Sequence, residues 1–160
     1  MKRQRGMVLM LTLTLSLLLG LLVASGLREA LLLSWTSGEL LRAAQALEDA
    51  QVSLLEGREQ LSLAPPQACL ACQPPATPHD IRGDEPFWQQ GSRGFFLLQN
   101  LGESTLAAHV PEGEPVTLFR ITAVSQQVRA RHVLEAVYAV SEQSPESLQR
   151  ILWRQRLREH

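Results

Sequence analysis

The chain has 160 residues, a formal net charge of -1 at pH 7, and an aromatic content of only 5%. A near-neutral chain offers no basic face to nucleic acid, so no nucleic-acid partner is predicted. The length allows one modest domain, and its core must consist chiefly of Leu, Val and Ala.

The N-terminal region combines a short basic segment with a long apolar one. Three basic residues precede Gly6, and the 21 residues of Met7–Leu27 carry no charge. Val23-Ala24-Ser25 would serve as a cleavage site, but a secretory signal has an apolar region of only about 7–15 residues. A helix of about 20 residues crosses a bilayer core of roughly 30 Å. We therefore predict a single-pass membrane anchor with a cytoplasmic N-terminus, and export of everything after Arg28.

Helical sequence continues beyond the predicted membrane segment, because no proline occurs before Pro65. We expect a nearly continuous helix that is transmembrane over 7–27 and amphipathic over 28–61. Gly38, with the capping-box spacing of Thr36 and Glu39, indicates a kink or a restart. The expected apolar stripe consists of Leu40, Ala44, Leu47 and Leu54, and the expected wetter face of Arg42, Glu48, Asp49 and Glu56.

Residues 62–92 form a proline-rich loop region that contains the two cysteines, Cys69 and Cys72. A redox-active Cys-x-x-Cys pair requires a helix N-terminus in a thioredoxin-like setting, which the flanking prolines do not favour. A zinc site requires four ligands, and only His79 lies nearby. An exported compartment is oxidising, so the favoured interpretation is a local disulfide. No metal and no cofactor are predicted.

Residues 93–160 have the pattern of an exported β-rich domain. Strands are predicted at Arg93–Gln99, Val116–Val124 and Arg131–Ser141, in a small antiparallel sheet of three or four strands covered by the outer half of the helix. Ser144-Pro145 is typical of a helix start, so a C-terminal helix is expected. Arg150, Arg154, Arg156 and Arg158 form a basic cluster, for which a solvated face is the favoured interpretation.

Motifs for catalysis are missing from the sequence. The four histidines are scattered without an HExxH pattern, and Gly91-Ser92-Arg93-Gly94 lacks the Lys-Ser/Thr of a phosphate-binding loop. We therefore predict that the protein is not an enzyme.

Three stretches resemble type IV pilins. Arg5-Gly6-Met7 is similar to a prepilin peptidase site, and the sequence from RQRGMVLMLTLTL to SGELLRAAQALEDAQVSLLEG resembles the N-terminal region of PilX-type minor pilins. LFRITAVSQQVRARHVLEAVYAV resembles paired strands of their exported domain. The resemblance implies an α+β pilin-like fold and residues 1–6 as a leader. It further implies cleavage between Gly6 and Met7 and N-methylation of Met7, and it suggests a last short strand around Ile151–Trp153.

Major pilins carry Glu at the fifth mature position, where this chain has Leu11. A carboxylate in the membrane is costly unless it is paired, and in pilins it is thought to meet the N-terminal ammonium of a neighbouring subunit. A subunit with Leu11 cannot offer that pair, although it can receive one from the next subunit. This asymmetry favours a place at a filament tip or in a priming complex over drift in an ordinary anchor.

The resemblance implies a structural subunit of type IV pilus assembly. Its partners would be other minor pilins, the major pilin, the prepilin peptidase and the inner membrane. The exported domain would lie in the periplasm and, after assembly, in the pilus. Two alternatives stay open: a minor pseudopilin of a type II secretion system, and a membrane-tethered periplasmic binding or thiol-redox module.

Overall fold

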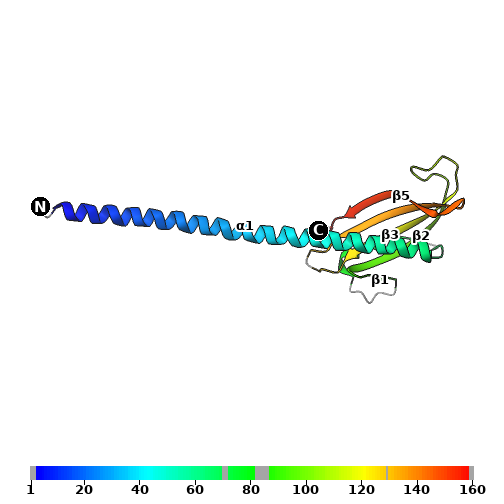
Figure 1. Ribbon diagram of the computed structural model, residues 1–160, viewed down its shortest axis with the longest axis horizontal. Coiled ribbons are helices and arrows are strands. Elements are labelled where there is room, and N and C mark those ends of the chain that lie inside the picture. Colours follow the sequence, from blue (N-terminus) through cyan, green and yellow to red (C-terminus); the bar gives the residue numbers. More distant parts are fainter. Residues whose placement is uncertain (1–2, 70–71, 82–86, 129, 159–160) are drawn as a thin grey trace. The chain divides into compact units, whose positions relative to one another are not determined.

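The computed structural model describes residues 3–69, 72–81, 87–128 and 130–158, with only the backbone described at 3–6, 145 and 146. Contacts within the chain divide it into two units, Met1–Leu41 and Arg42–His160, and each is described by itself. The elements (Figure 1) are α1 (Arg3–Leu63), the 3₁₀ turn η1 (Pro78–Asp80), and the strands β1 (Gln89–Gln90), β2 (Gly94–Ser104), β3 (Val116–Ser125), β4 (Val133–Ser141) and β5 (Ser144–Arg156).

The first unit is helical throughout its described part, and α1 does not restart at Gly38. The Thr36 hydroxyl does not cap a new helix: it donates to the carbonyl oxygens of Leu32 and Leu33, at 3.1 and 3.0 Å. A threonine that bonds back to the preceding turn is compatible with an uninterrupted helix. The expected restart is therefore wrong. α1 ends at Leu63, just before Pro65 and Pro66, which cannot continue a helix.

The second unit contains a sheet in the order β1-β2-β3-β4-β5, in which every neighbouring pair is antiparallel. The predicted α+β class is confirmed, since α1 packs on this sheet. Five strands are present where three or four were expected. The difference arises from β1, which has only two residues, and from β5.

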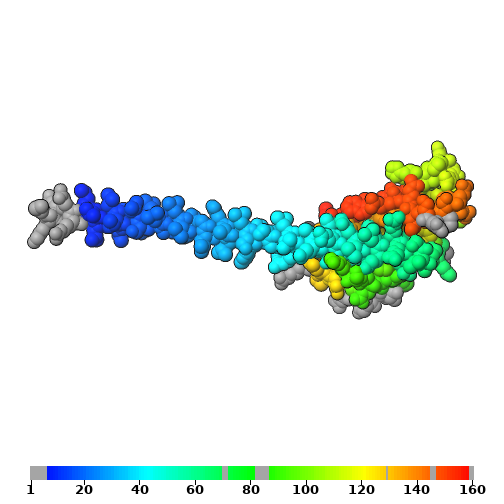
Figure 2. All heavy atoms as spheres, in the orientation of Figure 1, coloured from blue at the N-terminus to red at the C-terminus, as the bar shows by residue number. Residues whose placement is uncertain are grey.

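One face of the sheet packs against the part of α1 that belongs to this unit. Figure 2 shows the atoms of this part of α1 lying against the rest of the unit. The buried helix residues recur every three or four positions, as one side of a helix requires. The predicted stripe is largely wrong, because Leu40 and Ala44 are exposed, Leu47 is half-buried and only Leu54 is buried. The buried side instead consists of Ala46, Ala50, Ser53, Leu54, Gly57 and Leu61.

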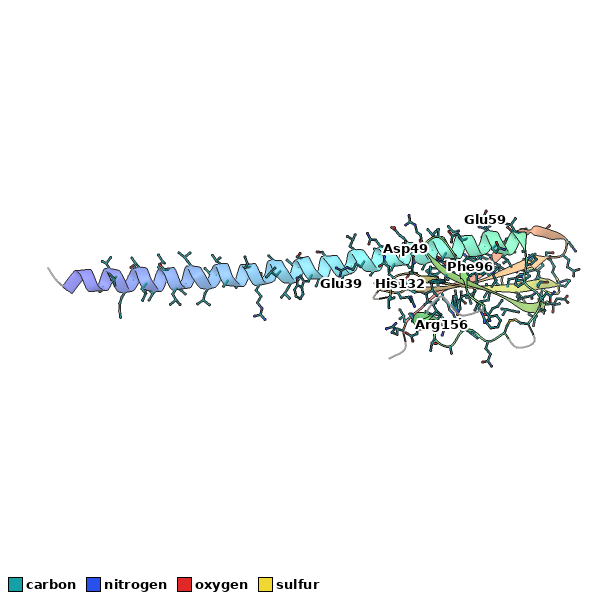
Figure 3. The ribbon with its side chains drawn as sticks, turned by 90° about the horizontal axis from the view of Figure 1, so that it is seen from below. Glu39, Asp49, Glu59, Phe96, His132 and Arg156 are labelled. Atoms are coloured by element: carbon teal, nitrogen blue, oxygen red, sulfur yellow. A yellow bond between two sulfur atoms is a disulfide. The ribbon has the colours of Figure 1, made fainter. Side chains whose placement is uncertain are left out.

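The main core lies between this side of α1 and strands β2 to β4, and Figure 3 shows Phe96 between helix and sheet. Small residues on the helix permit its close approach to the sheet. A side-chain carbon on Gly57 would lie only 2.8 Å from Cγ2 of the fully buried Ile121. The core consists of Ala50, Leu54, Leu61, Phe96, Phe119, Ile121, Ala123, Leu134, Ala136 and Tyr138.

The other face of the sheet is covered by the proline-rich region, a second cover that no sequence pattern predicted. Ile81 packs with Val124 and Val133 there, and Trp88 and Phe95 lie against them. The domain thus has three layers, with the sheet in the middle.

The expected C-terminal helix is wrong. Residues 144–156 form β5, which pairs with β4 from Val133↔Arg156 to Ser141↔Ser144. Proline at position 145 is compatible with a strand here because β5 lies at an edge of the sheet, where its missing N–H costs no ladder bond. Ser144 and Pro145 favour a helix start locally, but pairing with β4 favours the strand, and the strand forms.

Candidate functional site

The N-terminal part of α1 exposes its large apolar side chains. The large apolar residues between Met7 and Trp35 are 55% to 74% exposed. Met7–Leu63 contains an 18-residue window with a mean hydropathy of 2.5, and none of that window is buried. By length and composition, α1 is long and apolar enough to cross a membrane.

Three hydroxyl groups within this segment bond to the helix itself. Thr12 and Thr14 each donate to a carbonyl oxygen three residues earlier, at 3.0 Å, and Ser25 does so at 2.9 Å. A hydroxyl in hydrocarbon is costly only while its donor is unpaired. Thr12, Thr14 and Ser25 are therefore compatible with a lipid environment.

The residues predicted for processing and assembly lie at the start of α1. Gly6 is within the helix, Met7 is 71% exposed, and Leu11 is 66% exposed. Met7 and Leu11 are four residues apart, so their side chains share one face of the helix.

Cys69 and Cys72 form a disulfide, with Cα atoms 5.6 Å apart. The segment around it is tied to β2, since the amide of Cys69 donates to Asn100 O at 3.4 Å and the Asn100 side chain donates to Pro66 O at 3.0 Å. The disulfide follows the C-terminus of α1 and lies in irregular backbone, so it lacks the helix N-terminus that lowers a thiol pKa in redox proteins. A cavity of about 510 Å³ adjoins it, lined by residues that include Trp88, Leu97 and Gln99.

A buried ion cluster, which no sequence motif indicated, lies on the face of the sheet away from α1. Glu135 is 1% exposed and accepts from Arg154 Nε at 2.6 Å and from Arg156 Nη1 at 3.2 Å. Arg156 also donates to Pro75 O at 2.8 Å, and Figure 3 shows it beyond the sheet from the helix. The solvated face that was expected for these two arginines is therefore wrong, because both pair with a buried carboxylate. The sequence offered a signal for the burial of Glu135 but not for its partners: Val133, Glu135 and Val137 lie two residues apart, so in a strand they share one side.

Arg131 bonds to the end of the proline-rich region, at His79 and Ile81. Arg131 Nη1 donates to His79 O at 2.9 Å and to Ile81 O at 2.7 Å. Burial lowers the pKa of His79, and the nearby Arg158 guanidinium lowers it further. Burial likewise lowers the pKa of Arg131. Their hydrogen bonds show a structural role for both residues.

Two acidic residues of α1 bind the turn that joins β1 to β2. Glu56 accepts from the Ser92 amide at 3.0 Å and from the Ser92 hydroxyl, and Asp49 pairs with Arg93 at 3.3 Å. Both had been assigned to the wetter face, and both are half-buried. Among the residues that the structure describes, no group of three His, Cys, Asp or Glu side chains is placed to hold a metal ion.

Comparison with protein-family models, with curated proteins and with solved structures gave no match. The class that the fold and the apolar helix define is an α+β domain attached to a helix able to cross a membrane.

Proposed function

We propose that the protein is a PilX-type minor pilin, a non-catalytic subunit that takes part in type IV pilus assembly. The observation that carries the proposal is the unbroken helix α1, whose first part is uncharged and exposed from Met7 to Leu27 and whose last part packs on an antiparallel sheet. An ordinary anchor does not require its spanning helix to continue into a domain core. The short basic segment that ends at Gly6 adds support.

In this proposal, the helix holds the subunit in the bacterial inner membrane before assembly and packs against other pilins afterwards. The basic N-terminus stays in the cytoplasm, and the sheet domain is periplasmic. The prepilin peptidase cleaves between Gly6 and Met7, and Met7 is then N-methylated. Leu11 in place of Glu favours a position at the tip or in a priming complex. A minor pseudopilin would use the same helix, so it remains the alternative within this class.

A thiol-redox module is less well supported. The disulfide follows the C-terminus of α1 and lies in irregular backbone, and hydrogen bonds with Asn100 hold the segment at Pro66 and Cys69. These features suit a disulfide that stabilises the proline-rich region and holds it next to β2.

The anchor and its orientation can be tested with the full chain carrying a C-terminal epitope in bacterial cells. We expect the chain to stay in membranes after alkaline carbonate extraction, and added protease to remove the epitope from spheroplasts. Leu17→Arg with Leu18→Arg should abolish retention, because each charge at the centre of a span costs about 2.5–3.5 kcal/mol. Release of the wild-type chain by carbonate, or full protection of the epitope, would contradict the proposal.

A further inference from the structure

β5 leaves a long edge of the sheet unpaired. Within the described part of the chain it pairs with β4 alone and ends the strand order, whereas the opposite edge, β1, has only two residues. β5 has 13 residues and lies at the edge of the sheet (Figure 1), so the backbone groups on its outer side have no strand of the described residues to pair with. Such an edge is a template for another strand.

The side chains of this edge combine apolar and basic character. Leu152 and Trp153 are 43% and 46% exposed, and their partners Val137 and Ala136 show that they point to opposite faces of the sheet. The side chain of Arg154 is 53% exposed although it pairs with Glu135. Arg150 is exposed as well, and no carboxylate of the described residues forms an ion pair with it.

The two arginines also point to opposite faces. Arg154 pairs across the ladder with Glu135, on the face away from α1, and Arg150 pairs with Tyr138, whose side chain belongs to the core under α1. A bulge at residue 151 produces this change of parity, since Val137 faces Leu152 while Tyr138 faces Arg150.

A second copy of β5 offers no acidic partner to these arginines. Because residue 151 is bulged, an antiparallel pair of β5 strands centred on Leu152 would set Arg150 opposite Trp153 and Arg154 opposite Gln149. Centring the pair on Trp153 would set Arg150 opposite Gln155 and Arg154 opposite Leu152. Neither register gives Arg150 or Arg154 a carboxylate, so the charges of this edge suit a different chain.

We propose that β5 receives an extended segment of a different protein, which adds as a further strand of the sheet. This segment carries carboxylates opposite Arg150 and Arg154, on its two faces, and apolar side chains against Leu152 and Trp153. The backbone bonds supply affinity, and the charges select the partner. The inference stands on the domain alone and does not require that the protein be a pilin.

The test uses the full chain in detergent micelles and a fluorescent synthetic peptide of alternating valine and threonine with two glutamates three positions apart. That spacing puts the two carboxylates on opposite faces of an extended strand. The measured quantity is the dissociation constant by fluorescence anisotropy. We expect binding, with an otherwise identical lysine peptide about tenfold weaker. A glutamate peptide with N-methyl groups on alternate amides should not bind, because it cannot complete the ladder.

Variants locate the site. Arg150→Gln should weaken binding of the glutamate peptide about two- to fivefold, and Arg150→Glu should make the lysine peptide the better ligand. Arg93→Gln is the matched control, since it removes one exposed charge far from β5 and should leave the dissociation constant unchanged. Circular dichroism of each variant checks that the domain is folded. Absence of binding, equal binding of the N-methylated peptide, or indifference to both Arg150 variants would overturn the proposal.

Discussion

Leu11 and Glu135 illustrate when a carboxylate is tolerated away from water in this protein and when it is not. Position 11 has leucine and no acid, and it lies on an exposed, apolar part of α1. In the proposed function this part of the helix lies in lipid. At position 135 an acid is fully buried, and it is tolerated because two arginines and their hydrogen bonds satisfy both of its oxygens. A buried charge is acceptable only with such partners.

Leu11 provides a test of the proposed place in a fibre. If the subunit lies at a tip, Leu11→Glu puts a carboxylate in lipid without an ammonium to meet, at a cost of about 2–3 kcal/mol. We expect recovery of the variant in sheared surface fibres to be reduced or unchanged relative to wild type at equal expression, with impaired fibre initiation. A clear rise in recovery with normal initiation would show that the tip assignment is wrong.

Glu135 provides a test of the buried ion cluster. Glu135→Gln removes the charge but not the shape, and it leaves Arg154 and Arg156 without their ionic partner. We expect a loss of about 2–3 kcal/mol in the free energy of unfolding, measured by urea denaturation of the full chain in detergent with tryptophan fluorescence. The control is Glu103→Gln, an exposed acid of β2. A loss no larger than that of the control would mean that the cluster contributes nothing to stability.

At the scale of elements, α1 shows how one helix serves two environments. A side-chain carbon added to Gly38 would have no atom within 4 Å apart from the backbone of its own stretch of helix, whereas the corresponding carbon on Gly57 would meet Ile121 at 2.8 Å and Phe96 at 3.2 Å. The first glycine is tolerated without any packing requirement. The second lets helix and sheet approach each other closely.

These two glycines make a matched pair of substitutions. Alanine in a helix interior is favoured over glycine by about 0.5–1 kcal/mol, while overpacking a core costs about 1–3 kcal/mol. We expect Gly57→Ala to destabilise the sheet domain by about 1 kcal/mol on balance, and Gly38→Ala to leave its unfolding midpoint unchanged. Thermal unfolding followed by near-ultraviolet circular dichroism measures both. An equal or higher midpoint for Gly57→Ala would contradict the close approach of helix and sheet.

Helices and strands with a strong periodic pattern could be predicted from the sequence. A strand that forms only because it pairs with a neighbouring strand could not be predicted in this way. The long helix and the strands around Phe96, Ile121 and Val137 were predictable, because each is a strong local pattern. The helical stripe was placed wrongly because Ala46, Ala50 and Gly57 are small, and hydropathy gives small residues little weight. For β5 the local cap signal at Ser144 favoured a helix, whereas the resemblance suggested a short strand around Ile151–Trp153; the strand forms because it pairs with β4.

The same limit applies to the candidate site. Gly6, Met7 and Leu11 could be singled out because they lie in one short stretch of sequence. The Glu135 cluster could not, since its members come from β4, β5 and the proline-rich region, and only the sheet register brings Glu135 opposite Arg154. Contacts between distant segments are not encoded in any local pattern.

At the scale of the whole molecule, the two units have different tasks in the proposed function. Met1–Leu41 would supply the leader and the membrane segment, and Arg42–His160 supplies a three-layered domain with an open strand edge. None of these tasks requires catalysis. The central claim is that the chain matures as a prepilin, and it concerns a single peptide bond, the one that joins Gly6 to Met7.

Intact mass and N-terminal sequencing of the membrane form test that claim most directly. In cells with an active prepilin peptidase, we expect a chain that begins at Met7 and is one methyl group heavier than the unmodified sequence. Gly6→Val should keep residues 1–6 while still inserting into the membrane, because a side chain there blocks the close backbone approach that glycine permits. A wild-type chain that retains Met1–Gly6, or normal maturation of the Gly6→Val variant, would contradict the claim.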